Sequence, residues 1–223
     1  MSIPAQLNQI KGTLPNHVTL VAVSKTKPND QLMVAYDAGQ RVFGENKVQE
    51  LAQKYEDLPK DIEWHMIGHL QRNKVKYIAP FVNLIHAVDS EKLLKEINKQ
   101  GKKNNRIINV LLQIHIAQEE NKFGFNESEI STFLNSQSLS AYQNIQIIGL
   151  MGMATNTKTK EQVAKEFGYL KSLFDKLKAT DFKESKYFQE ISMGMSGDYK
   201  IAIEQGSTMV RVGSSIFGAR NIT

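Results

Sequence analysis

The regular alternation of apolar, strand-like runs with amphipathic helical segments is the feature that most limits the folds open to this chain. A short helical segment, Ala5 to Gly12, precedes the alternation. The predicted strands are Thr19–Ser24, Arg41–Gly44, Glu63–Ile67, Leu84–Val88, Ile107–Ile116, Ile145–Met151, Phe188–Ser192 and Met209–Val212. The helical pattern that follows each strand begins near Asn29, Asn46, Asn73, Ser90, Asn126, Thr159, Gly197 and Ser214.

Consecutive strand–helix units indicate a parallel sheet, because parallel strands need crossover connections that are usually helical. Eight such units within 223 residues predict an α/β fold, a single (β/α)8 TIM barrel with an N-terminal helix. An open doubly wound sheet is the alternative, since one or two strands are easily miscounted from sequence. No linker-like stretch or shift in composition divides the chain, so residues 1–223 are predicted to form one domain.

Composition excludes several classes of protein. The chain has no cysteine, so it has no disulfide framework, cysteine nucleophile or thiolate metal site. The absence of disulfides is consistent with a protein of a reducing compartment. It has neither a secretory signal pattern at its start nor an apolar run long enough to span a bilayer, and we expect a cytoplasmic protein without membrane contact. The net charge is +5, but lysines alternate with acidic residues, so nucleic-acid binding is not expected.

Chemically active side chains gather where the predicted strands end, the edge at which barrel enzymes place their active sites. Lys25 stands at the end of the first strand. A lysine among apolar neighbours has a lowered pKa, which favours condensation with an aldehyde, so we interpret Lys25 as a Schiff-base lysine. Lys27 is the competing candidate. Alternatively, either lysine is an ordinary solvated charge on the surface with no role in binding.

Two glycine- and serine-containing loops near the end of the chain indicate a phosphate site. Ser196-Gly197 and Gly213-Ser214-Ser215 are each expected to open a helix after the last two strands. Glycine lets backbone approach an anion, and the first N–H groups of a helix are unpaired donors. Either loop alone is explained more simply as a helix cap. Both loops together favour a phosphate site, because they follow the two strands after which barrels commonly bind phosphate.

Arg211 precedes this last loop on an otherwise apolar strand. A buried guanidinium requires a partner, either a ligand or a carboxylate such as Glu45 or Glu190. If Lys25 holds pyridoxal phosphate, Arg211 is a candidate donor to the pyridine nitrogen. His65 and His69 have the spacing of a zinc pair, but they lie on a strand entering a loop and no glutamate follows, so no metal site is predicted.

Several motifs resemble those of the pyridoxal-phosphate homeostasis proteins, the YggS/PROSC family. They are Ala22-Val23-Ser24-Lys25-Thr26-Lys27-Pro28, Phe43-Gly44-Glu45-Asn46, Trp64-His65-Met66-Ile67-Gly68-His69, Gly194-Met195-Ser196 and Ser207-Thr208-Met209-Val210-Arg211-Val212-Gly213-Ser214-Ser215. The resemblance extends from about Val18 to Arg220. Two loops depart from the family pattern, Met151–Asn156 and Gly197-Asp198-Tyr199.

The resemblance implies a barrel like the N-terminal domain of alanine racemase, with pyridoxal 5′-phosphate (PLP) on Lys25. It further implies phosphate binding by Ser196, Gly213 and Ser214, an Arg211 that faces the pyridine nitrogen, and an Asn46 that lines the cofactor.

The family holds and supplies PLP in vitamin B6 homeostasis, with apo-PLP enzymes as candidate recipients. We therefore expect a non-catalytic, monomeric PLP carrier. The alternatives are a PLP-dependent racemase or decarboxylase and a Schiff-base aldolase. Racemisation needs a second acid/base group opposite the lysine, which the sequence does not identify.

Overall fold

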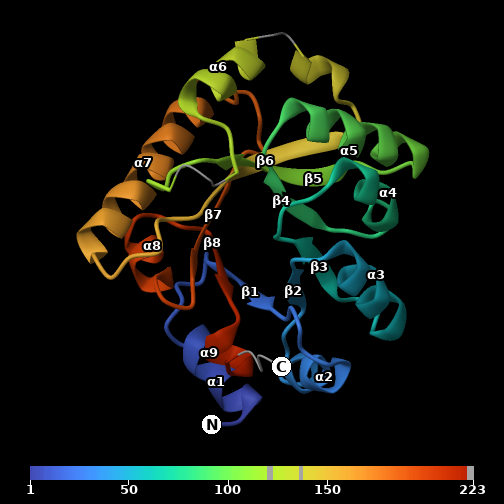
Figure 1. Cartoon of the computed structure of the whole chain (residues 1–223), viewed down its shortest axis with the longest axis vertical. Coiled ribbons are helices and arrows are strands. Elements are labelled where there is room, and N and C mark those ends of the chain that lie inside the picture. Colours follow the sequence, from blue (N-terminus) through green and yellow to red (C-terminus); the bar gives the residue numbers. More distant parts are fainter. Residues whose placement is uncertain (120–122, 136–137, 220–223) are drawn as a thin grey trace.

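Eight parallel strands form a closed barrel in the structure, a computed structural model that describes residues 1–119, 123–135 and 138–219. The strands are β1 (Thr19–Val23), β2 (Val42–Glu45), β3 (Glu63–Met66), β4 (Leu84–Val88), β5 (Ile108–Ile114), β6 (Ile145–Gly152), β7 (Glu190–Met195) and β8 (Met209–Val212). Each pairs with its neighbour in sequence, and β8 pairs with β1 to close the ring (Figure 1).

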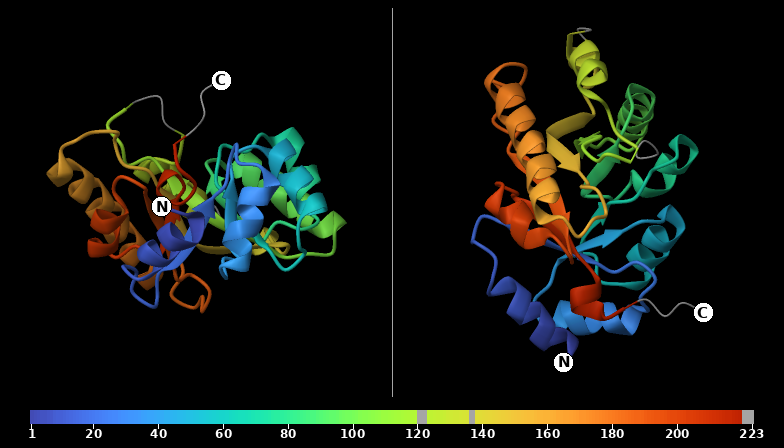
Figure 2. Two further views of the ribbon diagram at one scale, coloured as in Figure 1. Left: turned by 90° about the horizontal axis from the view of Figure 1, so that it is seen from below. Right: turned by 60° about the vertical axis from the view of Figure 1, so that its left-hand side comes forward.

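Helices follow the strands and surround the barrel (Figures 1 and 2). They are α1 (Ile3–Lys11), α2 (Asn29–Asp37), α3 (Val48–Asp57), α4 (Val75–Ile78), α5 (Glu91–Lys103), α6 (Glu127–Asn135), α7 (Lys160–Ala179), α8 (Tyr199–Glu204) and α9 (Ser214–Phe217). Two 3-10 turns, η1 (Arg72–Lys74) and η2 (Ser138–Ala141), complete the elements. The prediction of a (β/α)8 barrel with an N-terminal helix is confirmed, and the open sheet is wrong.

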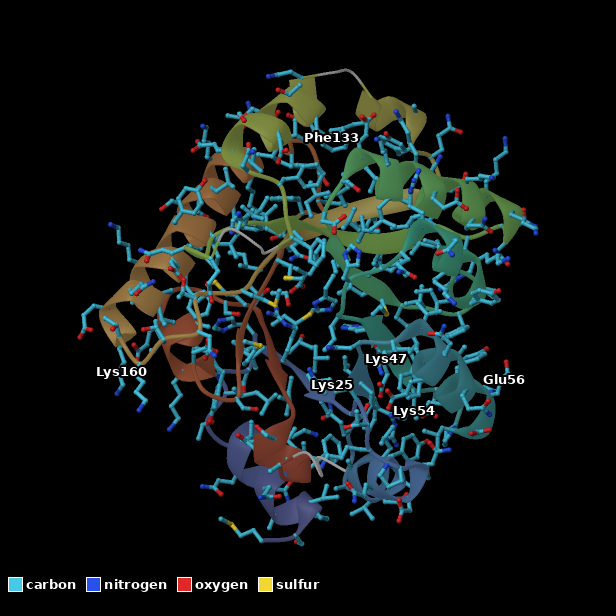
Figure 3. All side chains as sticks on the ribbon, viewed as in Figure 1. Lys25, Lys47, Lys54, Glu56, Phe133 and Lys160 are labelled. Carbon is cyan, nitrogen blue, oxygen red and sulfur yellow. The ribbon has the colours of Figure 1, made fainter. Side chains whose placement is uncertain are left out.

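The strands form because their side chains are apolar toward both the barrel interior and the helices. All five residues of β4 are buried, as expected for a strand covered on both faces. A small interior cluster contains Val21, Leu84, Leu111, Met151 and Met209, and a larger layer packs the strands against the helices. Side chains thus fill the barrel, which is a packed core and not a pore (Figure 3).

The two ends of the described chain lie side by side, because α1 packs against both α2 and α9 (Figures 1 and 2). Pro4 stands in the first turn of α1, where its missing N–H is not needed by the helix. Closure of the barrel therefore brings the loop after β1 next to the loop after β8. Among the described helices, none has both the length and the apolar character that crossing a bilayer requires.

Candidate functional site

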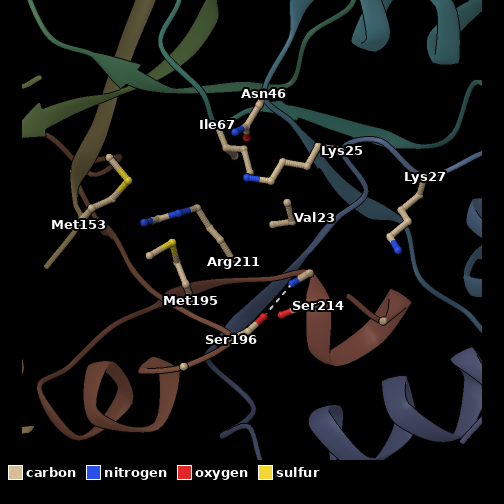
Figure 4. Close-up of a pocket in the computed structure, with 13 residues that line it drawn as sticks. Val23, Lys25, Lys27, Asn46, Ile67, Met153, Met195, Ser196, Arg211 and Ser214 are labelled. Atoms are coloured by element: carbon tan, nitrogen blue, oxygen red, sulfur yellow. Dashed lines mark hydrogen bonds between the residues drawn. The ribbon is translucent and has the colours of Figure 1, made fainter. Parts of the chain in front are cut away.

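A cavity of about 320 Å³ opens at the carboxyl ends of the strands. Most of the residues that line it come from β1, β7 and β8 or from the loops directly after β1, β2, β3, β6, β7 and β8, and Ser214 and Gly218 come from the two ends of α9. They include all six residues predicted to form the site: Lys25, Asn46, Ser196, Arg211, Gly213 and Ser214 (Figure 4). Barrel closure thus places side chains from both ends of the sequence around one cavity.

The two candidate lysines lie differently in the cavity wall. The Lys25 side chain extends toward Ile67 and Asn46 across the mouth of the barrel (Figure 4). The Nζ of Lys27 instead donates to the backbone oxygens of Phe217 and Ala219, at 2.9 and 3.1 Å. Lys27 therefore fastens the end of α9 to the loop after β1, and this favours Lys25 as the lysine that meets a ligand.

The two serine- and glycine-containing loops contact each other directly. The Gly213 N–H donates to Oγ of Ser196 at 3.2 Å, the dashed line in Figure 4. A Cβ on Gly213 would lie 3.0 Å from the Val23 oxygen, so glycine is what lets this loop pack closely on β1. Ser214 is the first residue of α9. The Ser196 and Ser214 side chains and the glycine backbone of both loops consequently lie at one end of the cavity.

The helix expected near Gly197 begins two residues later, at Tyr199, whereas α9 begins at Ser214 as expected. Oδ1 of Asp198 accepts from the Met195 N–H at 2.5 Å, and this bond closes the turn that precedes α8. Ser196 and Gly197 thus occupy the turn between β7 and α8, and α9 has only four residues. Individual N–H and O–H donors, and not the dipole of a long helix, supply the positive potential at this end.

Arg211 is buried, with only 4% of its surface exposed, yet it lines the cavity. Its Nη1 donates to Oγ of Ser192 at 2.6 Å and its Nη2 donates to the Gly152 oxygen at 3.1 Å. The carboxylates named as possible partners are engaged elsewhere, Glu45 with Lys54 and Glu190 with Thr208. Burial lowers the pKa of Arg211 to about 10, so the guanidinium remains charged at neutral pH.

A chain of buried polar side chains continues from Arg211 across the barrel. Ser192 Oγ lies 2.9 Å from Nδ1 of His86, and Nε2 of His86 lies 3.0 Å from Nδ1 of His65. His86 is on β4 and Ser192 is on β7, which are not neighbours in the sheet, so this contact spans the barrel interior. His69, the other member of the histidine pair, contacts Asp89 instead, at 3.0 Å.

Arg211 favours one direction for the hydrogen bonds in this chain. A guanidinium can only donate, so Ser192 Oγ accepts from it, and the Ser192 proton is used within the chain when it is donated to Nδ1 of His86. His86 then carries its proton on Nε2 and donates to Nδ1 of His65. Burial lowers the pKa of His65 to about 3 and that of His86 well below its ordinary value, so both rings are neutral.

The two loops that depart from the family pattern are each held by a carboxylate. In the loop after β6, Thr155 donates from its N–H and its Oγ1 to Glu166 on α7, at 2.6 and 2.7 Å. In the loop after β7, Asp198 accepts from the Met195 N–H and closes the turn. Met153, within the first of these loops, and Met195, just before the second, line the cavity beside Arg211 (Figure 4).

Sequence reasoning missed part of this arrangement. Ile67, Met153, Met195 and Gly218 also line the cavity, and their positions after strand ends or helix α9 were the signal available for them. His86 gave no such signal, because it lies within an apolar strand. Ser192 ends the predicted strand Phe188–Ser192, but only the barrel's closure reveals that its side chain meets His86.

Comparison with known proteins defines the class first. Residues 2–221 match the family described as "Alanine racemase, N-terminal domain". The alanine racemase of Bartonella henselae superposes with a TM-score of 0.71 at 14% identity, covering 99% of this chain and 63% of the racemase, which shows a shared fold.

Other relatives are much more similar in sequence. The pyridoxal phosphate homeostasis protein of Vibrio alginolyticus is 40% identical over 217 residues, 94% of this chain and 90% of the relative. That of Aquifex aeolicus is 38% identical over 206 residues, 92% of this chain and 88% of the relative. PipY of Synechococcus elongatus with PLP bound has a TM-score of 0.88 at 34% identity, over 97% of this chain and 100% of PipY. The chain belongs to the pyridoxal phosphate homeostasis family.

Proposed function

We propose that this protein binds PLP as a Schiff base on Lys25 and acts as a non-catalytic carrier that maintains the intracellular pool of this cofactor. The observation that carries the proposal is the cavity itself, with a lysine amine on one side and two hydroxyl- and N–H-bearing loops on the other. The solved complex of PipY with PLP supports it, since PipY shares the whole barrel.

The donor set suits the chemistry of the cofactor. The phosphate requires several hydrogen-bond donors, which Ser196, Ser214 and the Gly213 loop supply without a carboxylate among the described lining residues. The aldehyde requires a primary amine, which Lys25 supplies. A cavity of about 320 Å³ is also within the range of small-molecule sites.

Formation and hydrolysis of the imine need no reacting group of the protein other than the amine of Lys25. The unprotonated Nζ of Lys25 attacks the aldehyde carbon, a carbon–nitrogen double bond replaces the carbon–oxygen double bond, and the oxygen leaves as water. Addition of water reverses the step and releases the aldehyde. Arg211, as the group expected to face the pyridine nitrogen, cannot give up its proton, so the ring remains a weak acceptor of electrons.

The composition of the cavity wall supports a carrier over an enzyme. Its described side chains include two lysines and one arginine, but no His, Tyr, Asp or Glu that would serve as the second acid/base group of a racemase. No tyrosine is among the described residues that line the cavity. Tyr36 donates to Asp61, and Tyr199 contacts Thr13.

The decisive experiment is the visible spectrum of the protein mixed with PLP. The parent chain should show the absorbance of a PLP imine, and Lys25→Ala should lose it. Lys27→Ala is the matched control and should retain the band. If Lys25→Ala keeps an unchanged band, the assignment is wrong.

Two further measurements separate the alternatives. Borohydride reduction followed by mass measurement should give a pyridoxyl adduct on Lys25, whereas an aldolase would trap a sugar phosphate. Exchange of the amino-acid α-hydrogen for deuterium at enzyme-like rates would identify a racemase, and we expect none. We further propose a cytoplasmic monomer that passes PLP to apo-PLP enzymes, which transfer to a purified apoenzyme would test.

A further inference from the structure

A buried ionic cluster lies directly behind the loop that carries Lys25. Lys54 on α3 donates from Nζ to Oε1 of Glu45 and to Oε1 of Glu50, each at 2.7 Å, and to the Ser24 oxygen at 2.8 Å. The three side chains are 6%, 0% and 22% exposed for Lys54, Glu45 and Glu50. Lys54 thus reaches from α3 to the end of β2 and to the residue after β1, and Figure 3 labels its position. An ammonium has three donors, and here all three are used.

This cluster bonds to the backbone on both sides of Lys25. The Ser24 oxygen belongs to the peptide that enters Lys25 and accepts from Lys54. The Thr26 N–H belongs to the peptide that leaves Lys25 and donates to Oε1 of Glu50 at 2.6 Å. In addition, Oγ of Ser24 donates to Glu45 at 2.6 Å. Both peptide units that set the direction of the Lys25 side chain are therefore held by the same group of charges.

The backbone at this point adopts a conformation that needs such support. Thr26 has a φ of 64°, the left-handed region, which is unfavourable for a β-branched residue. Strain of this kind persists where surrounding contacts fix the backbone, and it is concentrated at functional sites. The hydrogen bond from Thr26 to Glu50 supports it, together with the turn that the Lys27 N–H closes by donating to the Ser24 oxygen at 3.0 Å.

We propose that Glu45, Glu50 and Lys54 form a buried clamp that positions Lys25 for imine formation. The inference rests on the proposed function and names positioning residues for it. The cluster is not among the residues that line the cavity, so it acts on a ligand only indirectly. Glu50 acts through the loop that carries Lys25, whereas Glu45 also precedes Asn46 in the chain. Misplacement of a reacting group by about 1 Å can lower a rate by about 100-fold.

The test is Glu50→Ala, which removes the acceptor for Thr26 and leaves the buried pair between Lys54 and Glu45. The rate of imine formation, followed by absorbance after mixing the apo protein with PLP, should fall about tenfold or more. Binding of pyridoxine 5′-phosphate, which has an alcohol in place of the aldehyde, should change less than about twofold, because its phosphate site is untouched. Hydrogen exchange of the Thr26 amide in the apo protein should become faster.

The conservative variant and a matched control make the result decisive. Glu50→Gln keeps an oxygen that can accept from Thr26, and it should recover most of the rate. Asp175→Ala removes the acid of an exposed i,i+4 pair with Lys171 and should change neither the imine rate nor the binding of pyridoxine 5′-phosphate.

Equal losses of imine rate and pyridoxine 5′-phosphate binding, or an unchanged imine rate with faster Thr26 exchange, would overturn the clamp. A parent chain that forms no imine would instead overturn the proposed function.

Discussion

Acid should destabilise the folded chain through its two buried histidines, and His65 allows the effect to be measured. Burial lowers the pKa of His65 to about 3, whereas a histidine in an unfolded chain titrates near 6.5. The unfolded chain therefore binds one more proton at His65 between these two values. This contribution to stability is complete above pH 6.5 and is lost as the pH falls toward 3.

The expected loss at His65 is about 1.4 kcal/mol per pH unit below 6.5, or about 2 kcal/mol between pH 7 and pH 5. His86 adds a loss of the same sign, because its pKa is also lowered by burial. Glu45 acts in the opposite direction, since burial raises its pKa to about 7 and the folded chain then retains a proton that the unfolded chain releases. A comparison between the parent and a His65 variant cancels the contribution of Glu45. It cancels the part of the His86 contribution that burial sets, and it retains the part due to His65 itself, which also lowers the pKa of His86.

The assay is urea unfolding of the ligand-free chain at several pH values from 7 to 5. His65→Asn is the chosen variant because the introduced amide oxygen can accept from Nε2 of His86 in place of the imidazole. Between pH 7 and pH 5 the parent should lose about 2 kcal/mol more than this variant. His17→Asn, which replaces an exposed histidine, is the control for the substitution itself. Parallel pH dependences of the parent and His65→Asn would refute the buried, neutral state of His65.

Two glycines give predictions about the cavity wall. A Cβ on Gly68 would lie 2.6 Å from the Asn46 backbone oxygen, so Gly68→Ala should displace Asn46, cost about 1–3 kcal/mol in urea unfolding and weaken PLP binding. Unchanged PLP affinity would remove Asn46 from the site. A Cβ on Gly213 would lie 3.0 Å from the Val23 oxygen, so Gly213→Ala should shift the loop and weaken pyridoxine 5′-phosphate binding, measured by calorimetry. Lys25→Ala should leave that binding in place, and the opposite pattern would contradict the phosphate assignment.

The sequence predicted the barrel and the site's main residues because both depend on local patterns. An apolar run marks a buried strand, and a polar residue after it marks the functional edge, as at Lys25 and Asn46. The partners of Arg211 were not predictable, because Ser192 and Gly152 lie on other strands and their distance depends on register and closure. Lys54 gave no signal either, since a lysine in a polar helix pattern looks like a solvated charge.

The pairing of β1 with β8 determines how late during synthesis the two sides of the cavity can come together. During synthesis the ribosome releases β1 first and β8 last, at about 5–20 residues per second, so on the order of ten seconds or more separates Lys25 from Gly213 and Ser214. Until β8 adds to the edge of β1, the lysine has no phosphate loop beside it. Loading with a ligand that needs both is therefore a late event, and only a chain that has completed its barrel can be loaded.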